Sequence, residues 1–356
     1  MHVPDNYLGV STCATLAVAS APVLIHSIRK VARDFPKERF SALGVAAAFS
    51  FLAMMFNVPL PGGTTGHAVG GTVLAVLLGP EAACVAIAIA LTIQALLFGD
   101  GGVVALGANI FNMAIVLTFG GYFAFVALRK LFGVGAKSAT EARFRVRDCV
   151  AVGIASYVGL NLAALAAGVE FGIQPSLCAD EAGRALYCPY PLSVSIPAMA
   201  LGHLTLFGLA EVLFSVAVYG FAVKAAPGFA TNEAVFAAPT GEEPSGKRAG
   251  SGRAALYFAL ALLIALTPLG LLAQGTAWGE WGADEIAETT VDGKPLGYTP
   301  EGMANGFEWS SVMPDYSASG LPDWFAYVLA AIVGVSLSVV LFKLASVFVS
   351  EKKVAN

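Results

Sequence analysis

Long apolar runs follow one another along this chain, separated by shorter segments rich in glycine or charge. A helix needs about 20 predominantly apolar residues to cross the hydrocarbon core of a bilayer. The pattern therefore predicts an all-α polytopic membrane protein with about nine transmembrane helices. The candidate spans are 8–28, 41–58, 62–79, 81–98, 107–128, 149–169, 192–223, 254–274 and 325–347.

The third candidate span, 62–79, departs from the pattern of an unbroken helix. A Pro-Gly-Gly sequence stands at 61–63, and Gly70 and Gly71 interrupt the apolar run. Glycine and proline both disfavour a helix interior, and irregular backbone is tolerated at membrane depth only where protein or a cavity surrounds it. We expect part of this segment to be a broken or re-entrant helix.

The placement of basic residues sets the orientation in the membrane. Of the 20 lysines and arginines, all except Arg184 and Lys294 follow the first, fifth or seventh span or stand at the C-terminal end. Lysine and arginine concentrate in cytoplasmic loops. With nine spans, the basic residues after spans one, five and seven and those at the C-terminal end all lie on the same side of the membrane. The N-terminus is therefore predicted to lie outside. The loops predicted outside with it are 59–66, 99–106, 170–191 and 275–324.

Composition narrows the class of protein further. Hydrophobic residues make up 57% of the chain and charged residues 12%, with a mean hydropathy of +0.74. Soluble domains carry roughly 25% charged residues, so a soluble enzyme, a disordered protein and a nucleic-acid binder are all excluded. We expect a multi-pass protein of a bacterial or archaeal cytoplasmic (inner) membrane, in contact with the lipid bilayer and not with nucleic acid.

One polar stretch, 225–253, divides the chain. It is rich in proline, glycine, serine and charge, which is typical of a flexible linker, here a cytoplasmic one. We predict a seven-span module at 1–224 and a two-span module at 254–356, whose acidic loop 275–324 lies outside. The linker sequence GEEPSGKR imitates a phosphate-binding loop, but Arg248 replaces the required Ser or Thr, so no nucleotide site is predicted.

The start of the chain has no secretory signal. MHVPDNYL lacks a basic region and carries Asp5 before the first apolar run. The mature chain is therefore expected to begin at Met1. Its free amine then lies outside.

The topology places His2 and His67 at the same outer end, beside this amine. A chain that starts Met-His offers the α-amine of Met1, the backbone nitrogen of His2 and the imidazole Nδ1 of His2. These nitrogens close chelate rings of five and six atoms. A second imidazole would complete a square of nitrogens, which favours Ni(II) or Cu(II). The alternative is that His2 is a solvated terminal residue and His67 only packs between helices.

Three stretches resemble a known family. The start MHVPDNYL, the block NVPLPGGTTGHAVGGTVLAVLLGPEAA and the block QALLFGDGGVVALGANIFNMAIV are similar to the NikM/CbiM family, the substrate-specificity components of nickel and cobalt energy-coupling-factor (ECF) transporters. The resemblance covers about residues 1–224. Residues 254–350 resemble, more loosely, a two-span NikN-type partner that is fused here into the same chain.

This resemblance implies a metal held by Met1, His2 and His67. Ni(II) is then the expected transported substrate, with Co(II) as the alternative. The resemblance also implies two partners, an energy-coupling transmembrane subunit and ABC ATPase subunits. The chain has no Walker A motif of its own and is not expected to be an enzyme. Asn6 stands where this family usually has glycine, and asparagine also tolerates a left-handed backbone.

Further polar residues lie in the two longer blocks. Asn109 and Asn112 are three positions apart and therefore share a helix face. Their side chains could hydrogen-bond a histidine ring and fix its tautomer. The alternative is hydrogen bonding between helices with no metal role. These candidates for a supporting shell are Thr65, Gln94, Asn109 and Asn112.

Several other residues have two interpretations each. Asp100, in GDGG, either attracts cations or serves as a turn residue. His203 and Glu211 in the seventh span either relay protons or make structural contacts, of which we favour the second. Cys178 and Cys188 flank an outer loop, where an oxidising exterior permits a disulfide; two free thiols are the alternative.

Other functions also fit a polytopic chain. A vitamin-binding transporter component predicts an aromatic-lined cavity and no role for the N-terminus. An intramembrane enzyme needs a nucleophile or clustered ligands at membrane depth, whereas His26 and His203 stand apart in the sequence. A channel predicts a ring of pore charges, and the sequence offers none.

Overall fold

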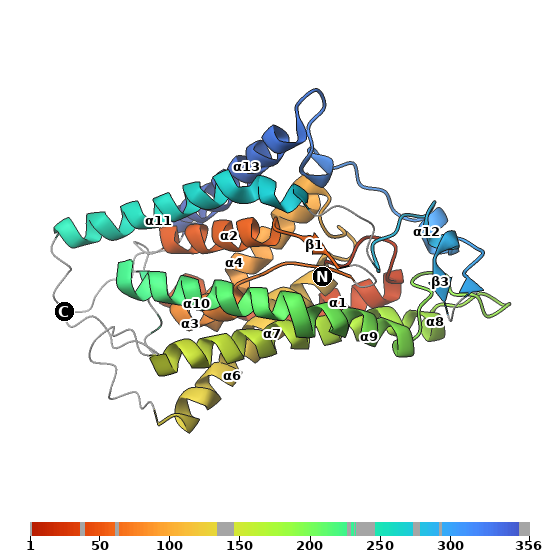
Figure 1. Cartoon of the computed structure of the whole chain (residues 1–356), viewed down its shortest axis with the longest axis horizontal. Helices are drawn as coiled ribbons and strands as arrows, with labels where there is room; N and C mark the ends of the chain where they lie inside the picture. Colours follow the sequence, from red (N-terminus) through yellow and green to blue (C-terminus); the bar gives the residue numbers. More distant parts are fainter. Residues whose placement is uncertain are drawn as a thin grey trace.

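Long apolar helices form the body of the protein (Figure 1). The computed structural model describes residues 2–35, 40–60, 64–133, 146–225, 229–230, 232, 246–272, 278–291 and 294–348. Within these ranges seven helical segments are long and apolar enough to cross a membrane, which confirms a multi-pass, all-α membrane protein. They are Val10–Asp34, Pro80–Phe98, Leu106–Leu131, Val146–Leu177, Leu192–Ala225, Ala254–Leu272 and Asp323–Val347.

The first module contains most of these helices, several of them locally widened. Three π-helical stretches, Gln94–Phe98, Ile110–Leu117 and His203–Phe207, continue α4, α5 and α9. A π-turn adds a residue to a helical turn and redirects the side chains around it. The α-helices are α1 (Val10–Asp34), α2 (Phe40–Met54), α3 (Gly71–Leu78), α4 (Pro80–Ile93), α5 (Leu106–Asn109), α6 (Thr118–Leu131), α7 (Val146–Gly172), α8 (Gln174–Leu177), α9 (Leu192–Gly202) and α10 (Gly208–Ala225).

The third candidate span is broken, as its glycines lead us to expect. Its helical part, α3, begins only at Gly71, after Gly70 adopts a left-handed backbone with φ of 74°. The preceding residues are extended, and β2 (Thr65–Gly66) pairs antiparallel with β1 (Val58–Pro59). His67 therefore stands on irregular backbone inside the bundle, which leaves its side chain accessible from the N-terminal segment.

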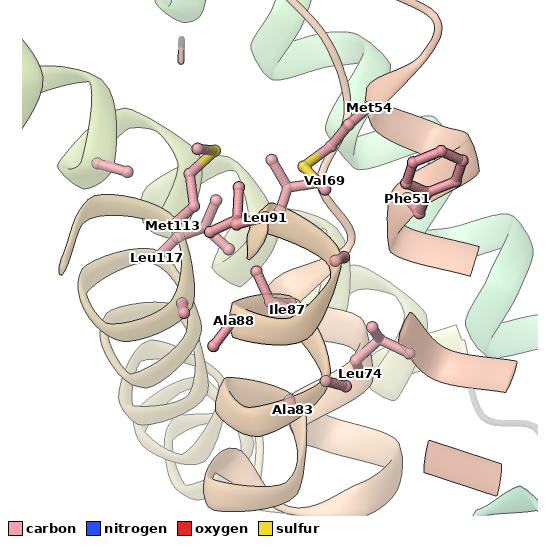
Figure 2. Packing of buried hydrophobic residues seen from close by; sticks show 14 of the residues in the cluster. Phe51, Met54, Val69, Leu74, Ala83, Ile87, Ala88, Leu91, Met113 and Leu117 are labelled. Atoms are coloured by element: carbon pink, nitrogen blue, oxygen red, sulfur yellow. The ribbon is translucent and has the colours of Figure 1, made fainter. Parts of the chain in front are cut away.

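Apolar side chains fill the centre of the bundle around α3 and α4 (Figure 2). Met54 from α2, Leu74 from α3, Leu91 from α4 and Met113 from the following π-helical stretch are all at most 1% exposed. Dense packing of this kind holds membrane bundles together, because lipid is as apolar as the side chains and supplies no hydrophobic driving force. The rigid core fixes the short segment that carries His67.

Small residues allow three helices to approach closely beside this core. A Cβ atom on Gly121 of α6 would lie 1.9 Å from Oγ1 of Thr72 in α3. A Cβ atom on Gly159 of α7 would lie 2.7 Å from the same hydroxyl oxygen. The backbones therefore meet at Thr72 because both neighbours lack a side chain, a common device in membrane bundles.

The second module begins earlier than the sequence predicts. Helix α11 starts at Gly246, inside the stretch 225–253 that we expect to be a flexible linker, and most of the remaining linker lies outside the described residues. Asn232 of the linker donates hydrogen bonds to the carbonyls of Ala75 and Val76 near the end of α3. Carbonyls in the last turn of a helix can accept such bonds, so they attach this part of the linker to the bundle.

The second module packs along α2 (Figure 1). A Cβ atom on Gly334 of α13 would lie 2.1 Å from the ring of Phe51, so the two helices interlock there. Between α11 and α13, residues 278–291 and 294–322 form an outer segment at the same end as α8 (Figure 1). The elements are α11 (Gly246–Leu266), 3₁₀ turns at Thr267–Leu272, Ile286–Glu288 and Pro314–Tyr316, β3 (Thr290–Val291), β4 (Lys294–Pro295), α12 (Glu301–Ala304) and α13 (Asp323–Phe348).

Candidate metal site

The N-terminal segment runs into the bundle and is held there by side-chain hydrogen bonds to its backbone. Asn109 of α5 accepts from the backbone nitrogen of Val3 at 2.8 Å and donates to the carbonyl of Val3 at 3.0 Å. Farther along, Oε1 of Gln174 accepts from the backbone nitrogen of Gly9 at 2.9 Å. Both amides are buried, so an extended segment without secondary structure still has its polar groups satisfied.

Asp5 anchors the same segment to the turn before α5. Its carboxylate accepts hydrogen bonds from the backbone nitrogens of Val103, Val104 and Ala105, at 2.8 to 3.2 Å. These nitrogens precede the helix and are otherwise unpaired donors, which a carboxylate satisfies well. Asn6 follows with φ of 67°, so its left-handed backbone is confirmed. The anchor and the turn fix the path of the residues before them.

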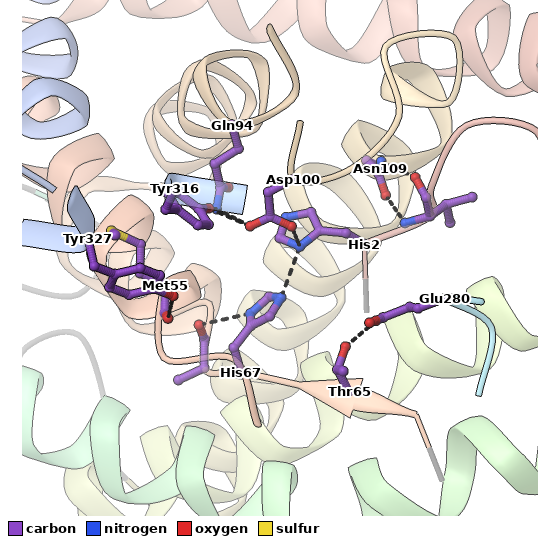
Figure 3. A network of polar contacts seen from close by, with 12 residues as sticks. His2, Met55, Thr65, His67, Gln94, Asp100, Asn109, Glu280, Tyr316 and Tyr327 are labelled. Carbon is purple, nitrogen blue, oxygen red and sulfur yellow. Dashed lines mark hydrogen bonds and ion pairs between the residues drawn. The ribbon is translucent and has the colours of Figure 1, made fainter. Parts of the chain in front are cut away.

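This path brings His2 against His67 (Figure 3). Nδ1 of His2 lies 3.2 Å from Nε2 of His67, and the ring centroids are 4.8 Å apart. The two side chains are 8% and 2% exposed, which excludes the alternative of a solvated terminal histidine. Nδ1 of His67 faces the carbonyl of Ala68 at 3.2 Å. A proton on that nitrogen would be donated to the carbonyl, which leaves Nε2 with its lone pair directed at His2.

Asp100 is the third member of this cluster. Its Oδ1 lies 3.1 Å from Nδ1 of His2, and its Oδ2 accepts hydrogen bonds from Gln94 and from the hydroxyl of Tyr316. Burial acts to raise the pKa of Asp100, but His2 and Tyr316 more than offset it and hold the pKa well below its usual range. Burial, and then the charge of Asp100, raise the pKa of Tyr316. Both shifts involve the hydrogen bond that the carboxylate accepts from the phenol.

Three of the supporting residues proposed from the sequence, Thr65, Gln94 and Asn109, lie around the cluster, and the hydrogen bonds described for them are to other partners than the histidine rings (Figure 3). Gln94 donates to Asp100 and to Tyr316. Thr65 donates to Glu280 of the outer segment. Asn109 holds the backbone of Val3, and Asn112, on the redirected π-helical turn, donates to Glu170 of α7. Met1 lies outside the described residues.

The outer segment of the second module contacts the N-terminal segment directly. Asn6 donates to the carbonyl of Phe307 and accepts from the backbone nitrogen of the same residue, at 3.0 and 2.9 Å. The hydroxyl of Tyr7 donates to the carbonyl of Trp281 at 2.8 Å. Sequence reasoning missed these contacts, and the role of Tyr316, because the partners are more than 200 residues apart. For Asp100, the polar GDGG turn was a visible signal.

Two further pairs from the sequence are now resolved. Glu211 accepts from the backbone nitrogens of Val69 and Gly70, so the favoured structural contact is confirmed and explains how the extended segment after His67 is held. Cys178 and Cys188 are both free, which corrects the expectation of a disulfide. Cys188 is fully buried, and burial raises the pKa of its thiol to about 12. A thiol in that environment forms little of the thiolate that oxidation requires.

Comparison with known families decides what kind of protein carries this site. Residues 2–229 match the family described as "Cobalt uptake substrate-specific transmembrane region", CbiM. The chain belongs to the CbiM family. Its remaining part, residues 252–351, matches the PDGLE domain. The resemblance seen in the sequence is thereby confirmed, and membership makes this CbiM-family chain a membrane component of metal transport.

Relatives share both modules. The CbiM-family chain is 43% identical over 345 residues to a probable fused nickel transport protein, LarMN, of Lactiplantibacillus plantarum, covering 96% of this chain and 97% of that protein. It is 43% identical over 350 residues to the fused nickel transport protein NikMN of Rhodobacter capsulatus, covering 95% of each. A crystal structure of a truncated transition metal transporter is 44% identical, with a TM-score of 0.58, and covers 63% of this chain and 99% of that chain.

Proposed function

We propose that this chain captures Ni(II) at the outer face of the membrane for ATP-driven uptake. The metal is held by the amine of Met1, the backbone nitrogen and Nδ1 of His2, and Nε2 of His67. One observation carries the proposal: two buried imidazole nitrogens, 65 positions apart in the sequence, lie 3.2 Å from each other. Nothing in the packing of an apolar bundle requires such a pair.

The distance suits two neighbouring ligands of one metal ion. Metal–imidazole bonds are roughly 2.0 Å long, so two nitrogens at a right angle around the ion are roughly 2.8 Å apart, slightly less than the 3.2 Å between Nδ1 of His2 and Nε2 of His67. The described residues offer two imidazoles here, with the carboxylate of Asp100 beside His2, which is fewer nitrogens than a planar four-nitrogen site needs. Backbone nitrogen is the donor that completes the site, and it becomes available at the start of the chain.

This donor set favours nickel over cobalt. Four nitrogens in a plane are the preferred arrangement of Ni(II) and Cu(II), and the backbone amide loses its proton readily only to such ions. Co(II) is the alternative substrate, since cobalt uptake gives the family its description. Direct competition between the two ions, measured on the purified protein, distinguishes these substrates.

Release of the metal inside the cell requires an energy source outside this chain. We propose that an energy-coupling membrane subunit and ABC ATPase subunits provide it. The sequence supports this in one respect: its closest approach to a nucleotide-binding loop, GEEPSGKR, lacks the Ser or Thr that would bind Mg²⁺. Co-purification of the chain with such subunits tests the assignment.

The metal site is tested by changing one nitrogen donor at a time. Adding one residue before Met1 displaces the amine, and His2→Ala or His67→Ala each removes an imidazole. We expect each change to abolish tight nickel binding by the purified full-length protein, measured by equilibrium dialysis with metal analysis. Affinity of the unchanged protein should fall as pH falls, because protons compete for the same nitrogens.

His26→Ala is the matched control, since this histidine is exposed on α1 and distant in sequence from the cluster. We expect it to bind nickel as the unchanged protein does. Undiminished binding by the extended chain and by both alanine variants of the cluster would refute the proposed site.

A further inference from the structure

A carboxylate lies against the two imidazoles, and a residue of the second module holds it there (Figure 3). Oδ1 of Asp100 is 3.1 Å from Nδ1 of His2, the nitrogen assigned to the metal. Oδ2 accepts from Nε2 of Gln94 at 3.1 Å and from the hydroxyl of Tyr316. The carboxylate side chain is 18% exposed, and each hydrogen bond or ion pair described for it is with a group that can donate a proton. An ionised carboxylate is acceptor-only and matches this set of partners.

An unusual backbone turn places Tyr316 in this position. Asp315 and Tyr316 both have left-handed backbones, with φ of 49° and 59°, which L-residues other than glycine, asparagine and aspartate seldom adopt. The ring stacks on Phe98 with centroids 4.9 Å apart and meets Phe51 and Tyr327 edge-on. Backbone strain of this kind persists only where the surrounding contacts hold it in place, and it is common at functional sites. Here its effect is to direct the phenol hydroxyl at Asp100.

The buried metal complex has a charge that must be balanced. A divalent ion brings two positive charges, and the deprotonated amide of His2 cancels one of them. The amine and both imidazoles bind as neutral ligands, so one positive charge remains. An unpaired charge in a protein interior is strongly unfavourable. Before metal binds, a proton on Nδ1 of His2 would be donated to Asp100. Metal binding at Nδ1 would leave the ring proton on Nε2, so that the imidazole stays neutral, and would release the amide proton of His2 to solvent, while the carboxylate stays.

We propose that Asp100 supplies the balancing negative charge for the captured divalent cation and that Tyr316 positions it, an inference that rests on the nitrogen site proposed above. The second module thereby contributes to metal retention without providing a ligand. Glu280 is the other acidic residue of the cluster drawn in Figure 3, but it accepts from Thr65, and its interaction with His2 is electrostatic, without a hydrogen bond or ion pair among the described residues. Asp100 is the carboxylate in contact with the ligating nitrogen.

The proposal is tested by removing the charge and the hydroxyl separately and together. Asp100→Asn keeps the size of the side chain but removes its charge, and Tyr316→Phe keeps the stacked ring but removes its hydroxyl. Nickel dissociation constants of the full-length protein are measured by competition with a chelator. We expect Asp100→Asn to weaken binding roughly 10- to 100-fold, the range seen for groups that support metal ligands, and Tyr316→Phe to weaken it by a smaller factor.

Two further variants separate positioning from general stability. Because Tyr316 acts through Asp100, Tyr316→Phe should have no additional effect in the Asp100→Asn background, as a double-mutant cycle would show. Tyr327→Phe is the matched control. Tyr327 packs against the same ring but donates to the carbonyl of Met55, so its variant should bind nickel normally. In all variants the visible absorption band of bound Ni(II) should keep its position, since the ligands are unchanged.

Each outcome decides between the two proposals. If His67→Ala abolishes nickel binding but Asp100→Asn binds as the unchanged protein does, the charge-balancing role is wrong and the nitrogen site stands. If Glu280→Gln weakens binding and Asp100→Asn does not, the counter-charge lies on the outer segment instead. If His67→Ala retains binding, the nitrogen site itself is wrong. Should Asp100→Asn fail to fold, Tyr316→Phe with its Tyr327→Phe control still tests the inference.

Discussion

At the scale of single residues, the position of His2 depends on hydrogen bonds made by the residues that follow it in the N-terminal segment. Asn109 bonds both polar groups of the Val3 backbone, Asp5 bonds the turn before α5, and Gln174 bonds Gly9. An extended segment has many accessible conformations, and ordering it costs about 1–2 kcal/mol per residue in entropy. These contacts offset that cost before the metal arrives, so less of the binding energy is spent on ordering the ligand.

The Asn109→Ala variant tests this pre-ordering. It leaves every proposed metal ligand in place but removes both hydrogen bonds to Val3, so the N-terminal segment should become more mobile. We expect nickel affinity to fall by about tenfold, toward the lower end of the range for groups that support ligands. Asn161→Ala is the control, because Asn161 bonds only the carbonyl of Tyr157 on its own helix, away from this segment. Equal affinities in the two variants would contradict the role assigned to Asn109.

At the scale of elements, α3 is short because the residues before Gly71 are extended, and this extended segment carries His67. A continuous helix through residues 64–70 would carry all its backbone hydrogen bonds internally and would leave no extended segment to present His67. Glu211 accepts from the nitrogens of Val69 and Gly70 in place of helical carbonyls. The half-helix is then held by close packing, where α6 and α7 meet Thr72.

Gly121→Ala tests the importance of that packing. The added methyl group would collide with the hydroxyl of Thr72, and overpacking of a tight interior typically costs about 1–3 kcal/mol. We expect a lower unfolding temperature of the purified protein, measured by the loss of helical circular dichroism. In Gly120→Ala, on the neighbouring residue, the methyl group would meet only the end of the Leu162 side chain, which can move. A stability loss of the same size in both variants would show that close approach to α3 is not the cause.

At the scale of the whole molecule, the two modules behave as one packed body. Helix α13 interlocks with α2 at Gly334, and the outer segment bonds the N-terminal segment and the turn that bears Asp100. The linker therefore connects two modules that also pack against each other through these contacts. The second module is therefore built into the first around the candidate site, and not merely attached to it.

Cleavage of the linker tests this view of the assembly. A protease site placed between residues 233 and 245 would cut the chain without touching the contacts described above. We expect the two fragments to co-purify after cleavage in detergent, as judged by size-exclusion chromatography. The Gly334→Leu variant should release them, because the larger side chain pushes α13 away from Phe51. Separation of the fragments without that substitution would show that the linker alone joins the modules.

Much of the fold was predictable because each membrane-spanning helix is a continuous run of apolar residues in the sequence. Nine apolar runs predict the seven spanning helices in the described ranges together with the shorter α2 and α3, and the glycines at 70 and 71 locate the break. The sequence was less informative where the signal was not hydrophobic. Helix α11 begins at Gly246, inside the polar stretch, and of the two alternatives for Cys178 and Cys188 the structure has free thiols.

The sequence alone determined the membrane class and placed His2 and His67 at the same end of the bundle, because apolar length and charge placement constrain topology. A shared role for the two histidines was what the family resemblance implied. Only the tertiary structure decided what surrounds that pair. Asp100 becomes a neighbour of His2 through a turn, and Tyr316 reaches Asp100 from 216 positions away. Neither contact follows from a local pattern, since each depends on how two separately folded segments pack, and packing is a property of the assembled bundle.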